Sequence, residues 1–298
     1  MNPPRFGRVL TAMVTPFAPD GSIDFEVAIE LAVRLVAEGS DALVLAGSTG
    51  EGSSLSDPEK LELFACVAGA VEVPVIAGCT SSDTARSIAL TALVADTGAS
   101  GVLATTPAYA RPNQAGIAAH LGAIAQSTEL PVMLYDIPSR TGRKIASSTT
   151  IELVEHHENI VALKDASGDV VSAAHTKMVL DDRLDLYSGD DSMLLAFMAI
   201  GGAGIVSVAA HWAGPEFAQI VGHVLEGDWV GARRVNERLA ASCAFEGTDA
   251  YPNPMPTKAV LRALGVAVGQ CRLPHGPADA ALDAMASEIL AGLAAHRG

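Results

Sequence analysis

Short runs of apolar residues recur along the chain, and longer segments of helical period separate them. The runs span residues 9–17, 42–50, 74–79, 101–107, 131–138, 160–167, 184–189 and 203–211. Most are rich in Val, Ile or Leu, and nearly all end in Gly, Pro, Ser or Thr, which is typical of buried parallel strands. Between them, Val27, Leu31 and Leu35 show the spacing of one helix face. Asp57 and Pro58 predict another helix start, with Asp57 as its N-cap.

This alternation predicts an α/β fold, a (β/α)8 TIM barrel, in which the sheet closes on itself and exposes no strand edge. A doubly wound open sheet is the competing fold, but no G-x-G-x-x-G motif follows the first run. The eighth run ends near residue 211, and the rest of the chain has a helical pattern. We therefore expect residues 1–225 to form the barrel and residues 226–298 to form a C-terminal helical subdomain.

Composition narrows the class of protein. The 298 residues are 49% hydrophobic, which is enough for a large core. The formal net charge of −15 argues against nucleic acid or an anionic membrane as a partner. The four cysteines are widely spaced, as expected of reduced thiols. With neither a signal peptide nor an apolar stretch of about 18 residues, we expect a soluble, cytoplasmic protein.

In such a barrel the chemistry lies at the C-terminal ends of the strands. Here those ends carry hydroxyls, phenols, glycines, one amine and one guanidinium; they are Thr15-Pro16, residues 47–51, 105–109, 135–142, Lys164, residues 188–191 and residues 207–211. No histidines with ligand spacing and no His/Asp/Glu cluster gather there. We therefore expect no metal ion, and a metal-dependent aldolase or amidohydrolase is disfavoured.

The amine is Lys164, one of only five lysines, and it ends the sixth run. Strand alternation predicts that Ile160, Ala162 and Lys164 share one face. If that face lines the barrel, burial favours the neutral amine, which can attack a ketone and form an imine. The same position also suits a structural lysine that pairs with Asp165 or Asp190. The strand pattern alone leaves both interpretations open.

Several motifs carry a family resemblance when they are taken in order. They are "GSTGE", "TPAYARP", "YDIPSRTG", "LKDASGD", "SGDD", "GIVSV" and "NPMPTK". Together they resemble the dihydrodipicolinate synthase / N-acetylneuraminate lyase superfamily over about residues 7–290. The resemblance implies a class I aldolase-type barrel in which pyruvate forms a Schiff base with a lysine. It implies neither a metal ion nor any other cofactor.

The resemblance also implies the catalytic residues. Lys164 matches the Schiff-base lysine, and Tyr135 matches the phenol that moves protons during the reaction. Ser48 stands where the family usually has a second threonine of a proton relay. Tyr109 matches the relay tyrosine that a partner subunit supplies, although Ala108 replaces the tyrosine that commonly precedes it. The implied assembly is a homotetramer, a dimer of dimers with Tyr109 shared across an interface.

Four further residues match substrate-binding positions. Thr49 resembles the residue that binds the pyruvate carboxylate, and flanking glycines let backbone donors approach an anion. The backbone carbonyl at Val206 is expected to face pyruvate, and Gly189 in "SGDD" to line the same site. Arg140 resembles the arginine that binds the carboxylate of aspartate semialdehyde, a contact that suits a guanidinium. The implied reaction condenses pyruvate with aspartate semialdehyde in lysine biosynthesis.

Two alternatives remain at this point. The same residues would serve another pyruvate-dependent class I aldolase, lyase or hydratase. Outside the enzymes, the chain could be a catalytically silent paralogue that binds 2-oxo acids.

Regulation by lysine is also open to a prediction. Lysine-inhibited relatives use polar and imidazole groups just after the "TGE" turn and an acid on the third helix. In this sequence those stretches contain Asp57, Lys60 and Arg86. Because the two cations would repel a lysine ammonium group, we expect weak or no inhibition by lysine.

Overall fold

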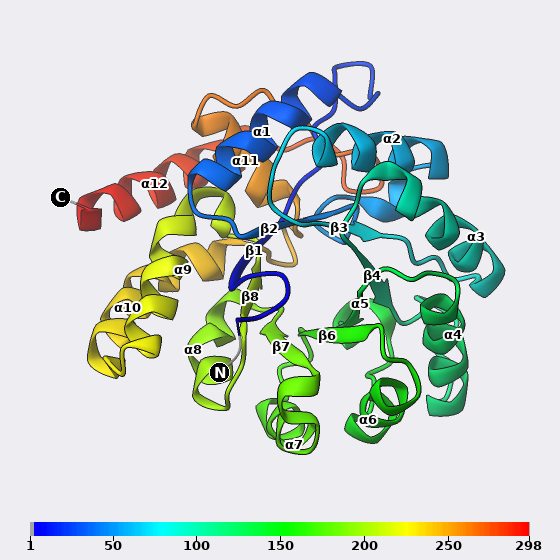
Figure 1. The fold of residues 1–298 in the computed structure, drawn as a ribbon. Coiled ribbons are helices and arrows are strands. Elements are labelled where there is room, and N and C mark those ends of the chain that lie inside the picture. Colours follow the sequence, from blue (N-terminus) through cyan, green and yellow to red (C-terminus); the bar gives the residue numbers. More distant parts are fainter. Residues whose placement is uncertain (1–2, 298) are drawn as a thin grey trace.

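The computed structural model describes residues 3–297, and these contain a closed barrel of eight parallel strands in sequential order. The strands are β1 (Val9–Ala12), β2 (Ala42–Leu45), β3 (Val75–Gly78), β4 (Gly101–Thr105), β5 (Val132–Asp136), β6 (Ile160–Asp165), β7 (Asp185–Ser188) and β8 (Gly204–Ser207). β8 pairs with β1 and closes the sheet (Figure 1). The predicted (β/α)8 barrel is confirmed.

Helices surround the barrel (Figure 1). They are α1 (Phe25–Ala37), α2 (Asp57–Ala68), α3 (Thr84–Val94), α4 (Gln114–Gln126), α5 (Pro138–Thr141), α6 (Ser147–His156), α7 (Val170–Leu180), α8 (Leu194–Ala199) and α9 (Ala210–Leu225). No helix between residues 3 and 297 is long and apolar enough to cross a membrane.

The start of α2 differs from the sequence prediction by one residue. Ser56, not Asp57, is the N-cap: its hydroxyl accepts from the Glu59 N–H, and the Glu59 carboxylate accepts from the Ser56 N–H at 2.8 Å. The Ser-x-x-Glu spacing lets each side chain satisfy a free backbone donor of the other residue, so this capping box takes precedence. The Asp57 carboxylate therefore stays available for another partner.

Side chains alternate between the barrel interior and the layer under the helices. The interior cluster includes Leu10, Val44, Ile76, Leu103, Met133, Tyr135, Ala162, Tyr187 and Val206. The prediction for Ile160 is wrong, because its side chain packs in the outer layer. Val132 of β5 pairs with Ile160, but the next residue, Met133, pairs with Ala162, so β6 carries one extra residue. Such a bulge reverses the alternation, and the strand beyond it still directs Lys164 inward.

The last part of the chain adds three helices, α10 (Trp229–Phe245), α11 (Met255–Ala263) and α12 (Ala280–Arg297). They share one apolar cluster with α9 and with Val9 and Ile205 of the barrel. The boundary predicted at residues 225/226 falls in the turn between α9 and α10, and it stays a prediction. The segment between α11 and α12 returns to the barrel, where the Phe17 N–H donates to the Val268 carbonyl at 3.1 Å.

Candidate active site at the barrel mouth

Lys164 and Tyr135 lie side by side at the C-terminal ends of β6 and β5, where they are register partners. Each is only 4% exposed, and the Lys164 Nζ lies 4.4 Å from the centre of the Tyr135 ring. The two candidate ion-pair partners are engaged elsewhere in the described chain: Asp165 accepts from the Ser167 N–H, and Asp190 accepts from the Ser192 N–H. A buried amine beside a phenol, with neither of these carboxylates on it, is suited to nucleophilic attack.

Gly189 determines the path of the lysine side chain. A Cβ at this position would lie 3.0 Å from Lys164 Cγ and 3.1 Å from Cε, so a larger residue would displace the lysine. The Gly189 N–H donates to the Asp165 carbonyl at 2.7 Å, which fixes this contact. Val206 is fully buried in the same interior cluster. The structure therefore places Gly189 against Lys164 and Val206 in the same interior cluster as Tyr135.

The turn after β2 presents Ser48 and Thr49, and it is tightly folded. A Cβ at Gly50 would lie 2.8 Å from the Ala46 backbone nitrogen, so only glycine fits. The Thr15 hydroxyl donates to the Gly50 carbonyl at 2.7 Å and ties the turn to the end of β1. Thr49 is 3% exposed, and Ser48 is half-buried. The turn that carries Ser48 and Thr49 is therefore held in one conformation.

Arg140 lies on the one-turn helix α5 and is exposed. Its Nη2 donates to the backbone carbonyl of Asn253 at 3.1 Å. The Asn253 side-chain amide in turn donates to the Thr49 hydroxyl at 2.9 Å. Sequence reasoning missed Asn253 as a site residue, although it opens the "NPMPTK" motif.

Tyr109 stands apart from the other candidates. It follows β4, its backbone is in the left-handed region with φ of 67°, and its side chain is 97% exposed. No contact within the described chain joins it to Lys164 or Tyr135. Its exposure is what a residue directed at a neighbouring subunit would show.

Two buried carboxyl groups lie behind the reactive pair. Asp136 and Asp165 follow Tyr135 and Lys164 on their strands and are register partners. Burial raises the pKa of Asp136 to about 7, and neighbouring Asp165 adds to the shift. Burial also raises the pKa of Asp165. Asp136 accepts from the Ile145 N–H at 3.0 Å, so it anchors the segment that carries Arg140 instead of entering the barrel.

Comparison with known proteins decides the family. The sequence model of the Dihydrodipicolinate synthetase family matches residues 5–291. The chain belongs to this family.

Relatives and solved structures agree over nearly the whole chain. It is 42% identical to the 4-hydroxy-tetrahydrodipicolinate synthase of Symbiobacterium thermophilum over 97% of this chain and 98% of that protein. The synthase of Mycobacterium leprae is also 42% identical, over 97% of both chains. The dihydrodipicolinate synthase of Cyanidioschyzon merolae, solved with lysine bound, has a TM-score of 0.94 at 40% identity, covering 97% of this chain and 98% of that one. The Acinetobacter baumannii enzyme, solved with pyruvate, has a TM-score of 0.92 at 30% identity, covering 97% and 99%.

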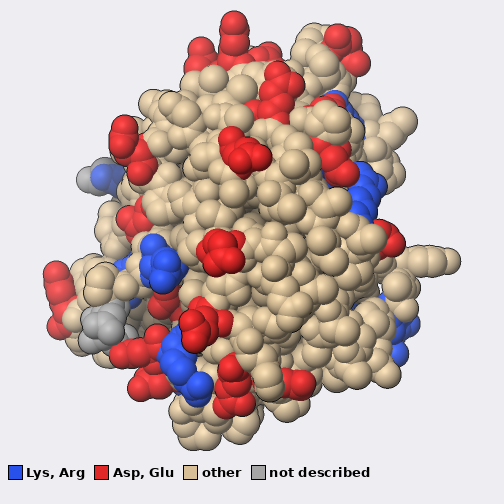
Figure 2. Space-filling view, turned by 45° about the vertical axis from the view of Figure 1, so that its right-hand side comes forward, with Lys and Arg blue, Asp and Glu red and all other residues tan. Residues whose placement is uncertain are grey.

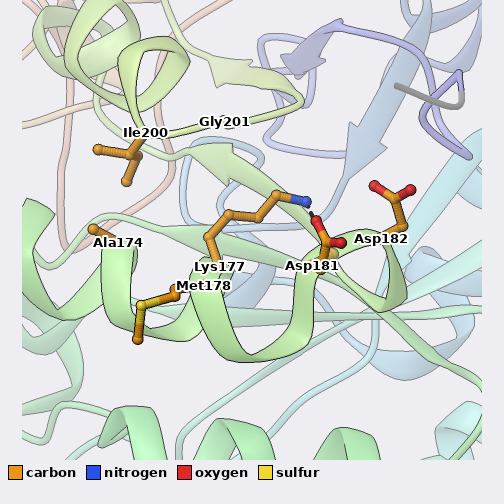
Figure 3. A pocket seen from close by; sticks show the side chains of 7 residues that line it. All are labelled: Ala174, Lys177, Met178, Asp181, Asp182, Ile200 and Gly201. Carbon is orange, nitrogen blue, oxygen red and sulfur yellow. Dashed lines mark hydrogen bonds between the residues drawn. The ribbon is translucent and has the colours of Figure 1, made fainter.

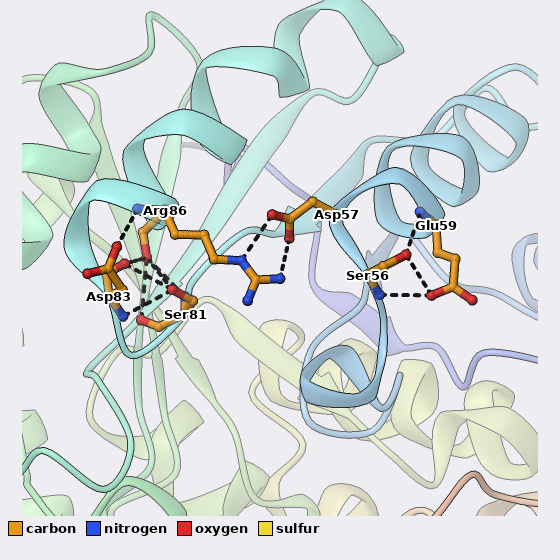
Figure 4. Close-up of polar contacts among 7 residues, drawn as sticks. Ser56, Asp57, Glu59, Ser81, Asp83 and Arg86 are labelled. Atoms are coloured by element: carbon orange, nitrogen blue, oxygen red, sulfur yellow. Dashed lines mark hydrogen bonds and ion pairs between the residues drawn. The ribbon is translucent and has the colours of Figure 1, made fainter.

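The stretch compared with the lysine-binding pocket of inhibited relatives contains an ion pair of its own (Figure 4). The Asp57 carboxylate accepts from Arg86 Nε at 3.0 Å and from Nη2 at 2.9 Å. The hydrogen bond from Arg86 holds the pKa of Asp57 below its usual range. Lys60, one turn further along α2, is buried, and its burial lowers the pKa of the amine.

Two surface hollows lie away from the barrel mouth. One of about 290 Å³ is lined by α7 and the segment after α8, including Lys177, Met178 and Ile200 (Figure 3). Its lysine donates to the Asp181 carbonyl at 2.6 Å and so completes the end of α7. The other, of about 740 Å³, lies between α4 and α6. Neither contains a residue of the candidate active site.

Proposed function

We propose that the protein catalyses the reaction of a 4-hydroxy-tetrahydrodipicolinate synthase, the condensation of pyruvate with L-aspartate semialdehyde in lysine and diaminopimelate biosynthesis. The observation that carries the proposal is the buried pair of Lys164 and Tyr135, with the Lys164 Nζ 4.4 Å from the phenol ring. Membership of the family and the names of relatives at 42% identity support this choice of reaction.

In the proposed mechanism, the Lys164 amine adds to the ketone carbon of pyruvate, and loss of water gives the imine. The protonated imine draws electrons from the neighbouring methyl carbon, which loses a proton and becomes a nucleophilic enamine. The enamine attacks the aldehyde carbon. The amino group of the new product then attacks the imine carbon, closes the ring and releases the lysine. No cofactor is needed, because the imine itself accepts the electron pair.

The remaining site residues take the roles that their positions allow. Tyr135, whose ring lies beside the amine, would carry protons to and from the leaving water and the aldehyde oxygen. Ser48 and Tyr109 would connect it to solvent as a proton relay. Thr49, Gly189 and Val206 would bind pyruvate.

Arg140 would bind the carboxylate of the aldehyde substrate at the rim of the site. Its guanidinium is exposed, and it has one hydrogen bond to a backbone carbonyl that a carboxylate could outcompete.

Trapping with borohydride tests the function. Incubation with pyruvate and sodium borohydride should add the mass of one reduced pyruvate adduct to the intact chain, and Lys164→Ala should show none. No adduct on the native chain would rule out the imine mechanism and favour a silent binding protein. A coupled assay with aspartate semialdehyde then separates the synthase from another pyruvate-dependent aldolase, which would form the adduct without turning over this aldehyde.

We also propose a homotetramer built as a dimer of dimers. Tyr109 is 97% exposed and precedes α4, whose residues Gln114–Gln126 include no Asp, Glu, Lys or Arg. Figure 2 brings this side forward and shows a broad area of uncharged residues. A second apolar face lies on α7, where Val171 is 82% and Met178 is 73% exposed. Two separate faces of this kind are what a dimer of dimers requires.

Light scattering in solution is expected to give the mass of four chains. Met178→Glu places a charge on the α7 face and should reduce this mass to that of two chains, since a buried unpaired charge is costly. Glu288→Gln, an exposed change on α12, is the matched control. A monomeric native protein would contradict the proposed assembly.

Inhibition by L-lysine is expected to be weak or absent. The bidentate Arg86–Asp57 pair and the buried Lys60 put two cations where a lysine ammonium group would have to bind. Calorimetry should detect no lysine binding at millimolar concentration, and the Cyanidioschyzon merolae enzyme, which was solved with lysine bound, is the positive control. Saturable binding that lowers activity would show this prediction to be wrong.

A further inference from the structure

The C-terminal part of the chain holds the turn after β2 at two points. At the first, the Asn253 amide reaches the Thr49 hydroxyl at 2.9 Å. At the second, the Glu51 carboxylate forms an ion pair with Lys258 Nζ at 2.7 Å and accepts a hydrogen bond from the Arg272 N–H at 2.8 Å. Glu51 has a left-handed backbone with φ of 52°, so this end of the turn needs external support. The first contact is made to the residue proposed to bind the pyruvate carboxylate, and the second lies two residues further along the turn.

The direction of the first hydrogen bond matters for the chemistry. The Thr257 hydroxyl donates to the Asn253 side-chain oxygen at 3.3 Å, which leaves the amide nitrogen to face Thr49. An amide N–H can only donate, so the Thr49 oxygen accepts. A threonine hydroxyl has a single proton, and that proton is therefore free to donate elsewhere.

Asn253 is itself held in place. Its backbone carbonyl accepts from Arg140 at 3.1 Å, and Thr257 is fully buried. The residues proposed to bind the carboxylates of the two substrates, Thr49 and Arg140, thus meet at one asparagine. Asn253 contacts Thr49 through its side-chain amide and Arg140 through its backbone carbonyl.

We propose that Asn253 is a positioning residue that directs the Thr49 hydroxyl proton toward the carboxylate of pyruvate. The inference rests on the proposed function, and in particular on pyruvate binding next to Lys164. An acceptor at position 253 would take the Thr49 proton for itself and leave an oxygen lone pair facing the anion. Pyruvate affinity should then fall through the loss of a charge-assisted hydrogen bond.

Asn253→Asp tests this directly, since it keeps the shape and replaces the donor with an acceptor. At about pH 8 we expect KM for pyruvate to rise roughly 10-fold or more, with kcat changed less. Asn253→Ala removes the donor without adding charge and should raise KM only about 3-fold. Asn236→Asp makes the same chemical change elsewhere in the C-terminal subdomain, on α10, and should leave both constants unaltered.

The pH profile separates positioning from a general structural role. A protonated aspartic acid can donate as asparagine does. The ratio of KM for Asn253→Asp to KM for the native protein should therefore fall as pH is lowered from about 6 toward 4, where an aspartic acid begins to take up its proton. The charged group that contacts residue 253 is Arg140, and both variants retain it. The corresponding ratio for Asn253→Ala should stay constant with pH.

Two results would overturn the inference: an unchanged KM for pyruvate in both variants, or the same pH-independent ratio in both. If Asn253→Asp does not fold, Asn253→Ala still tests the proposal. A KM for pyruvate equal to that of the native protein would contradict it. Borohydride trapping on the native chain distinguishes failure of the proposed role of Asn253 from failure of the proposed function. An adduct with unaffected variants refutes the role of Asn253 alone, whereas a missing adduct refutes the proposed function.

Discussion

Replacing Lys164 by methionine is expected to lower kcat at least about 10⁴-fold, because no other group can form the imine. The same change should leave the free energy of unfolding unchanged or larger. Lys164 is 4% exposed, and the candidate partners Asp165 and Asp190 bind backbone N–H groups instead. Methionine keeps nearly the same side-chain length and packing. It also removes a buried amine, and burying an amine away from water without an ion-pair partner costs stability. The coupled assay and urea unfolding measure the two quantities.

Lys144→Met is the matched control. Its amine forms a partly exposed ion pair with Asp169 at 2.6 Å, and such a pair is worth at most about 1 kcal/mol. We expect near-native activity and a small loss of stability. If Lys164→Met instead lost several kcal/mol of stability, the alternative that Lys164 is a structural lysine would be favoured.

Replacing Lys258 by methionine should cost about 3–5 kcal/mol of unfolding free energy. Lys258 Nζ and Glu51 Oε1 are 2.7 Å apart, and both side chains are fully buried. Burial lowers the pKa of Lys258, while the charge of Glu51 opposes that shift. Removing one partner leaves an uncompensated carboxylate in the protein interior, which is far more costly than removing both.

The double variant Lys258→Met, Glu51→Gln provides the control in the same urea experiment. A neutral amide oxygen can still accept from the Arg272 N–H, so most of the lost stability should return. Loss below about 1 kcal/mol in the single variant would mean that the pair is not buried as described.

The sequence predicted the barrel because period and strand ends are local properties. Alternation predicts that Ala162 and Lys164 share one face, and this holds because the bulge in β6 comes before both residues. Ile160, on the other side of the bulge, was placed on the wrong face. A bulge depends on how two strands pair, so the amino-acid sequence of one strand alone does not predict it.

The site itself was less accessible to sequence reasoning. The roles expected for Tyr135 and Thr49 come from motif order and the family resemblance, because neither period nor strand position distinguishes a reactive phenol or hydroxyl from a structural one. The contact between Thr49 and Asn253 joins residues 204 positions apart. No spacing rule reaches that far, and "NPMPTK" gave the only signal that its asparagine matters. The prediction of Asp57 as an N-cap fails for the opposite reason, since the Ser-x-x-Glu spacing of Ser56 and Glu59 is a local signal that the sequence already contains.

The residues that support the turn after β2 are synthesised long after the turn itself. Thr49 and Glu51 leave the ribosome 204 and 221 residues before Asn253 and Arg272, respectively. Until those residues and Lys258 arrive, the Glu51 carboxylate has no partner to accompany it into the protein interior, and the turn lacks its outer support. A nascent chain that already contains all eight strand segments still lacks these contacts. The contacts that support this turn therefore form only after translation has passed residue 272.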